Sequence, residues 1–146
     1  MYPNFALLFL MNSNHEILLL RRINTPFCNH CYCVPGGEIA AHEPASKAII
    51  REAQSSLGIS LKEDEIQCVH VMHRKCNEPE FFACVFKPTI WNGTPAINQA
   101  EKYDDLQWFA LDALPTNIVA AHLHAIQQIQ QGKTYSEHGW DLYVDK

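Results

Sequence analysis

Residues 34–59 read VPGGEIAAHEPASKAIIREAQSSLGI, and this stretch decides how the rest of the chain is arranged. Its pair of glycines, Gly36 and Gly37, allows backbone conformations that other residues cannot adopt. Pro44 suits the first turn of a helix, because its missing N–H costs nothing there. Apolar residues then recur at helical spacing up to Leu57, and Gly58 supplies a stop. The stretch therefore predicts a glycine-rich turn followed by a helix over residues 44–57.

Apolar runs on either side of this stretch predict strands. They cover residues 5–11, 16–22, 66–72, 80–86 and 106–111. The first two runs are separated by Asn12-Ser13-Asn14, a turn by composition, which predicts a hairpin. A second helix is expected from about residue 117 to 131, after Pro115. The order strand pair, helix, strands, helix predicts an α+β protein in which helices cover a mixed sheet.

Composition narrows the classes of function. A length of 146 residues predicts one domain that spans residues 1–146. With 16 acidic and 11 basic residues the chain has no general attraction for a phosphate backbone, so we expect no nucleic-acid polymer as partner. The first apolar run, residues 5–11, is too short for a membrane span and lacks the flanks of a signal peptide. We expect a soluble, cytoplasmic protein that does not bind membranes, and a homodimer is compatible with the sequence.

Several residues of the opening stretch fall on the register of a known signature. Gly37, Glu43, the pair Arg51-Glu52 and the pair Gly58-Ile59 match the pattern GX5EX7REUXEEXGU, in which U is a bulky aliphatic residue. The stretch resembles the Nudix box of hydrolases that cleave nucleoside diphosphates linked to another moiety. The resemblance covers nearly the whole chain and implies an α/β/α sandwich around a mixed β-sheet.

The box also departs from the family pattern at two positions. In the family, three carboxylates at helix positions i, i+3 and i+4 face one way and hold Mg²⁺ or Mn²⁺ on the pyrophosphate. Glu52 keeps the first position, whereas Ser55 and Ser56 stand at the other two, which lowers the charge of this cage from about −3 to about −1. The resemblance implies that the backbone of Gly37 adjoins the metal, and Glu101 is a candidate replacement ligand. We expect a weakly bound metal and impaired hydrolysis.

The remaining candidate site residues have roles that the resemblance or their chemistry implies. The catalytic candidates are Glu52, Arg51 and Glu43, with Arg51 pairing Glu43 or Glu52. The substrate candidates are Arg22, Gly36, Gly37, Glu38 and Asp104, with Arg22 as a bidentate phosphate donor and Asp104 on a nucleobase edge. Several of these candidates also have a structural alternative. An acidic residue such as Glu43 is favoured near the start of a helix by the helix dipole. Arg22 can be an exposed residue at a strand end, Asp104 can cap a turn, and Glu101 can be a solvated loop carboxylate.

Two functional hypotheses remain, and they belong to different classes. The first is a Nudix hydrolase of a nucleotide derivative, which the resemblance to the box favours. The second is a non-catalytic Nudix-fold module that binds or senses a nucleotide, which the Ser55-Ser56 pair favours. A third, a structural metal site at Cys28, Cys31 and Cys33, lacks a second ligand pair at zinc-finger spacing.

Overall fold

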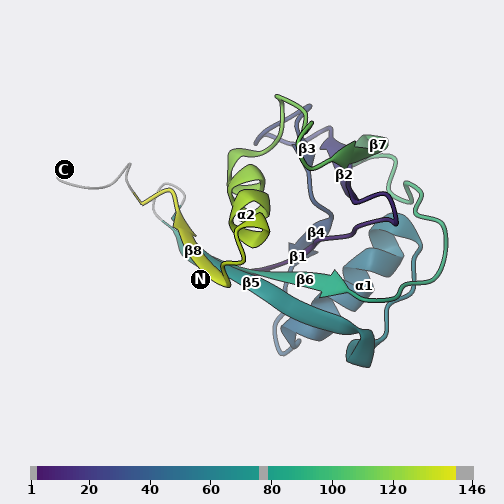
Figure 1. The fold of residues 1–146 in the computed structure, drawn as a ribbon, viewed down its shortest axis with the longest axis horizontal. Coiled ribbons are helices and arrows are strands. Elements are labelled where there is room, and N and C mark those ends of the chain that lie inside the picture. The colour runs from purple at the N-terminus through teal and green to yellow at the C-terminus, as the bar shows by residue number, and fades with distance from the viewer. Residues whose placement is uncertain (1–2, 76–78, 141–146) are drawn as a thin grey trace.

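Two sheets and two helices make up the computed structural model, which describes residues 3–75 and 79–140 (Figure 1). The five-stranded sheet has the order β4-β1-β6-β5-β8, and the three-stranded sheet has the order β3-β2-β7. The strands are β1 (Phe5–Leu8), β2 (Glu16–Arg22), β3 (Tyr32–Cys33), β4 (Gly36–Glu38), β5 (Ile66–Lys75), β6 (Glu80–Pro88), β7 (Tyr103–Ala110) and β8 (Tyr135–His138). The helices are α1 (Ala45–Leu57), α2 (Ala120–Gln130) and the short 3-10 helix η1 (Glu63–Glu65).

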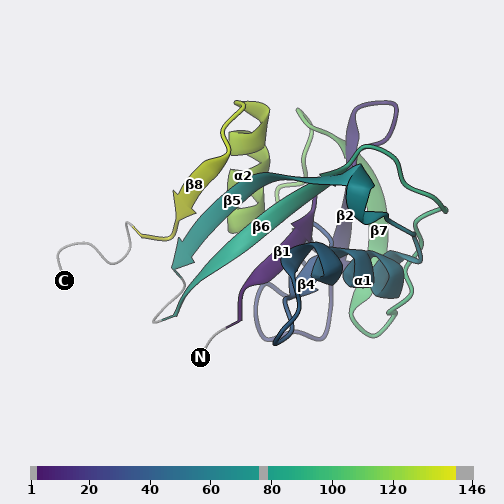
Figure 2. The same ribbon diagram turned by 90° about the horizontal axis from the view of Figure 1, so that it is seen from below.

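The chain around strand β1 explains why this architecture is a sandwich. Ala6 and Leu8 pack in the apolar cluster that contains the buried face of α1, whereas Leu7 and Phe9 pack in the cluster that contains α2. Because successive side chains of a strand point to opposite faces of the sheet, β1 is buried on both sides. The two helices therefore cover opposite faces, as the two views show (Figures 1 and 2). The predicted α+β class and the α/β/α sandwich are confirmed.

Helix α1 is placed by local signals and by its apolar stripe. It begins directly after Pro44 and ends at Leu57, and Gly58 follows in the left-handed conformation with φ 71°. Ile49 and Leu57 are fully buried, and burial of each such side chain stabilises the fold by roughly 1.5–3 kcal/mol. Packing of this stripe leaves Arg51 and Glu52 beside strand β4. No helix in the described parts of the chain is long and apolar enough to cross a membrane.

Other expectations about the elements need correction. The predicted hairpin of residues 5–11 and 16–22 is wrong, because β1 and β2 belong to different sheets and only an isolated bridge between Met11 and Ile17 joins the two segments. Instead β1 lies between β4 and β6, where both of its apolar faces are covered. The second helix begins at Ala120 rather than near residue 117, because Val119 N–H donates to the carbonyl of Tyr32.

Candidate active site

Arg51 connects the first helix to the turn that precedes it. Its Nε and Nη2 donate to the two carboxylate oxygens of Glu43 at 2.9 and 3.0 Å. Its Nη1 donates to Glu52 Oε1 at 3.0 Å, and Nη2 also donates to the carbonyl of Glu38 at 3.0 Å. The guanidinium lowers the pKa of Glu43 to about 2, helped by the N–H of Ala40. Bidentate, charge-assisted contacts of this kind fix geometry as well as charge, so Arg51 orients the carboxylate of Glu52.

The two glycines of strand β4 bring the backbone close to that carboxylate. A Cβ on Gly37 would collide with Oε1 and Cδ of Glu52, so the backbone of strand β4 lies directly against the carboxylate; the glycine-rich turn expected here is a strand paired with β1. Gly36 has φ +153°, and a Cβ there would collide with the carbonyl oxygen of Ala6 on the paired strand β1. Gly36 therefore requires glycine, because its neighbours are backbone atoms, whereas a Cβ on Gly37 would have to displace the Glu52 carboxylate.

The two serines of the box make different hydrogen bonds, and the Ser56 hydroxyl is the one that contacts the Glu52 carboxylate. Ser56 is 1% exposed, and its Oγ lies 3.4 Å from Glu52 Oε2 and 3.2 Å from Gln99 Oε1. Its hydroxyl can donate to either oxygen. Ser55 is exposed and its Oγ donates to the backbone carbonyl of Glu52 at 3.4 Å, so its hydroxyl bonds the helix backbone in this structure. Sequence reasoning missed Gln99, because it lies 43 residues from Ser56 in a connection without periodicity.

Two predicted site residues lie elsewhere. Glu101 is exposed, and its backbone carbonyl accepts a hydrogen bond from Asn24 Nδ2 at 2.9 Å. The residue of this loop whose side chain contacts Ser56 is Gln99. Asp104 forms an ion pair with Arg21 at 2.7 Å and is not among the residues that line the cavity beside Glu52.

The donor set limits how a metal ion can bind. Residues 3–75 and 79–140 contain no group of three or more His, Cys, Asp or Glu side chains placed to hold a metal ion, and this includes the loop of Cys28, Cys31 and Cys33. Glu52 offers a single carboxylate, and Arg51 already bonds one of its oxygens. Hard cations prefer several oxygen ligands. The residues therefore fit Mg²⁺ that arrives bound to substrate phosphates, and they do not fit a resident metal cluster.

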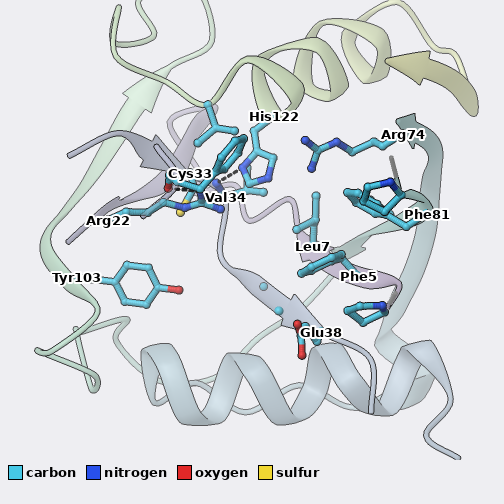
Figure 3. Close-up of a pocket in the computed structure, with 17 residues that line it drawn as sticks. Phe5, Leu7, Arg22, Cys33, Val34, Glu38, Arg74, Phe81, Tyr103 and His122 are labelled. Atoms are coloured by element: carbon cyan, nitrogen blue, oxygen red, sulfur yellow. Dashed lines mark hydrogen bonds between the residues drawn. The ribbon is translucent and has the colours of Figure 1, made fainter. Parts of the chain in front are cut away.

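The carboxylate of Glu52 opens on one half of a continuous cleft. We call this half the carboxylate cavity; its volume is about 410 Å³ and it is lined by Phe5, Gly36, Gly37, Glu38, Ala40, Arg51, Glu52, Lys102 and Tyr103. The other half, the aromatic pocket, has a volume of about 330 Å³ (Figure 3). The two halves share Phe5, Gly36, Gly37, Glu38 and Tyr103. Five predicted site residues, Gly36, Gly37, Glu38, Arg51 and Glu52, thus line the carboxylate cavity, whereas Glu43 acts on it through Arg51.

The aromatic pocket is mainly apolar, with a few polar groups. Its apolar lining includes Pro3, Phe5, Leu7, Val34, Pro79, Phe81, Ala83 and Val119, and its polar lining includes Arg22, Arg74, Tyr103 and His122. The guanidinium carbon of Arg74 lies 4.9 Å from the ring centroid of Phe81. Burial raises the pKa of Tyr103 to about 12, so its phenol stays protonated. Apolar walls with a few convergent polar groups are typical of small-molecule sites.

The chain is thus an α+β protein with a cleft that has one mainly apolar half and one charged half. Residues 1–129 match the family model described as "NUDIX domain", and the chain belongs to this family.

Comparisons with individual relatives agree with this assignment. An ADP-ribose pyrophosphatase of Methanocaldococcus jannaschii is 24% identical over 115 residues, which are 79% of this chain and 66% of that protein, so the chain spans just under two thirds of this relative. A MutT NUDIX hydrolase from Burkholderia pseudomallei superimposes with a TM-score of 0.78 at 27% identity, over 87% of this chain and 97% of that one. The NUDIX domain of Shewanella oneidensis NrtR, solved in complex with ADP ribose, gives a TM-score of 0.68 at 18% identity, over 90% and 88%.

Proposed function

We propose that this protein binds a nucleoside diphosphate linked to another moiety, and that it hydrolyses the pyrophosphate bond slowly. The observation that carries the proposal is the continuity of the carboxylate cavity with the aromatic pocket through Gly36 and Gly37. The pyrophosphate lies against the glycine backbone and Glu52, and the nucleoside lies in the aromatic pocket. The relatives named for ADP ribose, a compound of this class, support the same assignment.

Four charged residues of the cleft have roles in this proposal. Glu52 holds the attacking water or the metal, and Arg51 is a positioning residue that keeps the Glu52 carboxylate against Gly37. Arg22 and Lys102 line the cleft from the opposite side and neutralise phosphate charge. Mg²⁺ or Mn²⁺ bound to the phosphates supplies charge neutralisation and lowers the pKa of a bound water.

Hydrolysis is slow because Glu52 is the one carboxylate left at the three metal-binding positions of the box. Ser56 and Gln99, which adjoin Glu52, bring hydrogen bonds but no negative charge. Metal stabilisation of a transition state is worth several kcal/mol, and about 1.4 kcal/mol corresponds to a tenfold change in rate. The expected loss is several orders of magnitude relative to a site with the full set of carboxylates.

The test is product release from a panel of nucleoside diphosphate derivatives, including ADP-ribose and UDP-glucose, with Mg²⁺ and with EDTA. The proposal expects slow, Mg²⁺-dependent release that Glu52→Gln reduces about a hundredfold or more. Glu63→Gln is a matched control, because Glu63 lies on η1 and pairs with Lys47 at 2.7 Å, outside the cleft. Release that persists unchanged in Glu52→Gln contradicts the assignment of Glu52.

A second candidate function is a nucleotide-binding module without turnover. The observation that favours it is the direct contact of Ser56 with both Glu52 and Gln99, which leaves neutral groups where the box pattern expects a carboxylate. This candidate predicts that nucleotides raise the melting temperature equally in Mg²⁺ and in EDTA, and that no product accumulates. A melting temperature that no nucleotide changes contradicts both candidates.

A further inference from the structure

His122 reaches the aromatic pocket from helix α2 in a fixed tautomer. The side chain is buried, and the backbone N–H of Val34 donates to its Nδ1 at 3.1 Å. Because a backbone N–H can only donate, Nδ1 is unprotonated and the proton of the neutral ring lies on Nε2. Burial, together with the charges of Arg22 and Arg74, lowers the pKa of His122 to about 3. The ring is therefore neutral at physiological pH, and its Nε2–H is a hydrogen-bond donor.

The side chains around His122 are hydrogen-bond donors, and they lie at one end of the pocket. Figure 3 shows the ring between the side chains of Arg22 and Arg74, which approach from opposite sides of the pocket. A guanidinium group donates hydrogen bonds and accepts none. The carboxylate of Glu38 lies at the far end, beside helix α1 (Figure 3). We call the group of His122, Arg22 and Arg74 the donor end of the pocket.

We propose that His122 is a specificity-determining residue, which selects ligands whose base presents a carbonyl oxygen to the donor end of the pocket. The inference rests on the proposed function, because it assumes that a nucleoside occupies the aromatic pocket. A carbonyl oxygen accepts from Nε2–H and from a guanidinium, whereas an amino group in the same place accepts from neither. Buried donors that are left unpaired carry a desolvation cost.

Bases differ at this position in a way that can be tested. Hypoxanthine carries a carbonyl at C6, where adenine carries an amino group, and uracil carries a carbonyl at C4, where cytosine carries an amino group. Adenine N1 and N7 and cytosine N3 can accept hydrogen bonds, but the amino group flanks each of them and faces the donor end. Loss of one well-placed hydrogen bond to such a group lowers affinity about tenfold.

The experiment is calorimetric titration of the full chain with IDP, ADP, UDP and CDP. Wild type is expected to bind IDP about tenfold more tightly than ADP, and UDP about tenfold more tightly than CDP. His122→Asn keeps an acceptor for the Val34 N–H but does not reach the pocket, so both preferences should disappear. His122→Gln offers an amide that both donates and accepts, and it should bind both members of each pair alike. His124→Asn, two residues along the same helix and absent from the pocket lining, should keep both preferences.

The outcomes separate this inference from the proposed function. Binding of all four nucleotides with no carbonyl preference in wild type, or a preference that survives in both His122 variants, overturns the role of His122 and leaves the proposed function intact. If none of the four nucleotides binds, both the role of His122 and the proposed function are overturned. The wild-type comparison decides the carbonyl preference even where a His122 variant fails to fold.

Discussion

Restoring carboxylates to the box should make the stability of this protein depend on a metal. Ser56 is 1% exposed and its Oγ lies 3.4 Å from Glu52 Oε2, so Ser56→Glu places a second carboxylate about 5 Å from the first. At an effective dielectric constant near 20, two such charges repel by about 3 kcal/mol. In a chain of 146 residues, each kcal/mol shifts the melting temperature by roughly 2–4 °C. The double variant Ser55→Glu/Ser56→Glu should therefore melt roughly 6–12 °C below wild type in EDTA.

Millimolar Mg²⁺ should reverse most of this loss, because a cation that binds only the folded state stabilises it. Thermal melts of wild type, the double variant, and the matched neutral variant Ser55→Gln/Ser56→Gln measure the effect in EDTA and in Mg²⁺. Wild type and the glutamine variant should respond little to Mg²⁺. The placement of position 56 beside Glu52 is refuted if the glutamate and glutamine variants have the same melting temperature in EDTA. It is also refuted if Mg²⁺ does not raise the melting temperature of the glutamate variant.

Three further predictions concern the same cluster. Glu52→Gln should reduce any Mg²⁺-dependent hydrolysis about a hundredfold or more, measured as initial rates, while the melting temperature stays close to that of wild type because the ion pair with Arg51 is partly exposed. Gly37→Ala should displace the Glu52 carboxylate and lower nucleotide affinity in titrations, and an unchanged affinity would argue against their contact. Arg51→Met should return the pKa of Glu43 from about 2 toward its ordinary value of 4.5. The stability that this lowered pKa contributes in wild type is present above about pH 4.5 and is lost as the pH falls toward 2, so urea midpoints of wild type and variant should converge over that range.

Local signals explain why the sequence predicted parts of the fold correctly. Pro44 and Gly58 mark the ends of α1 by backbone preferences that act within one turn, and the helix lies between them. The pairing of β1 depends on contacts far along the chain, with Phe5 opposite Ala83 on β6. A turn at residues 12–14 says nothing about such partners, which is why the predicted hairpin was wrong. Strand β8 is short and pairs with β5 across a long separation, and its sequence has no strand periodicity.

The residues of the candidate site likewise fall into those that the sequence predicted and those that it missed. Gly37, Arg51 and Glu52 were found through the spacing of the box, and the structure brings them to one cavity, with Glu43 bonded to Arg51. Gln99 and His122 were missed because their positions depend on tertiary contacts: Gln99 with Ser56, and His122 with Val34. From sequence alone, a single histidine on a helix is interpreted as a core residue, because its hydrogen-bond partner on another element is not known.

The most direct test of the account is an NMR titration of the ¹⁵N-labelled protein with ADP-ribose and with UDP-glucose. The central claim is that the pyrophosphate lies against the backbone of strand β4 beside Glu52. The account predicts that the amide signals of Gly36, Gly37 and Glu38 shift most, together with those of residues that line the aromatic pocket. Saturable shifts confined to another face of the protein, with the β4 amides unmoved, would contradict it.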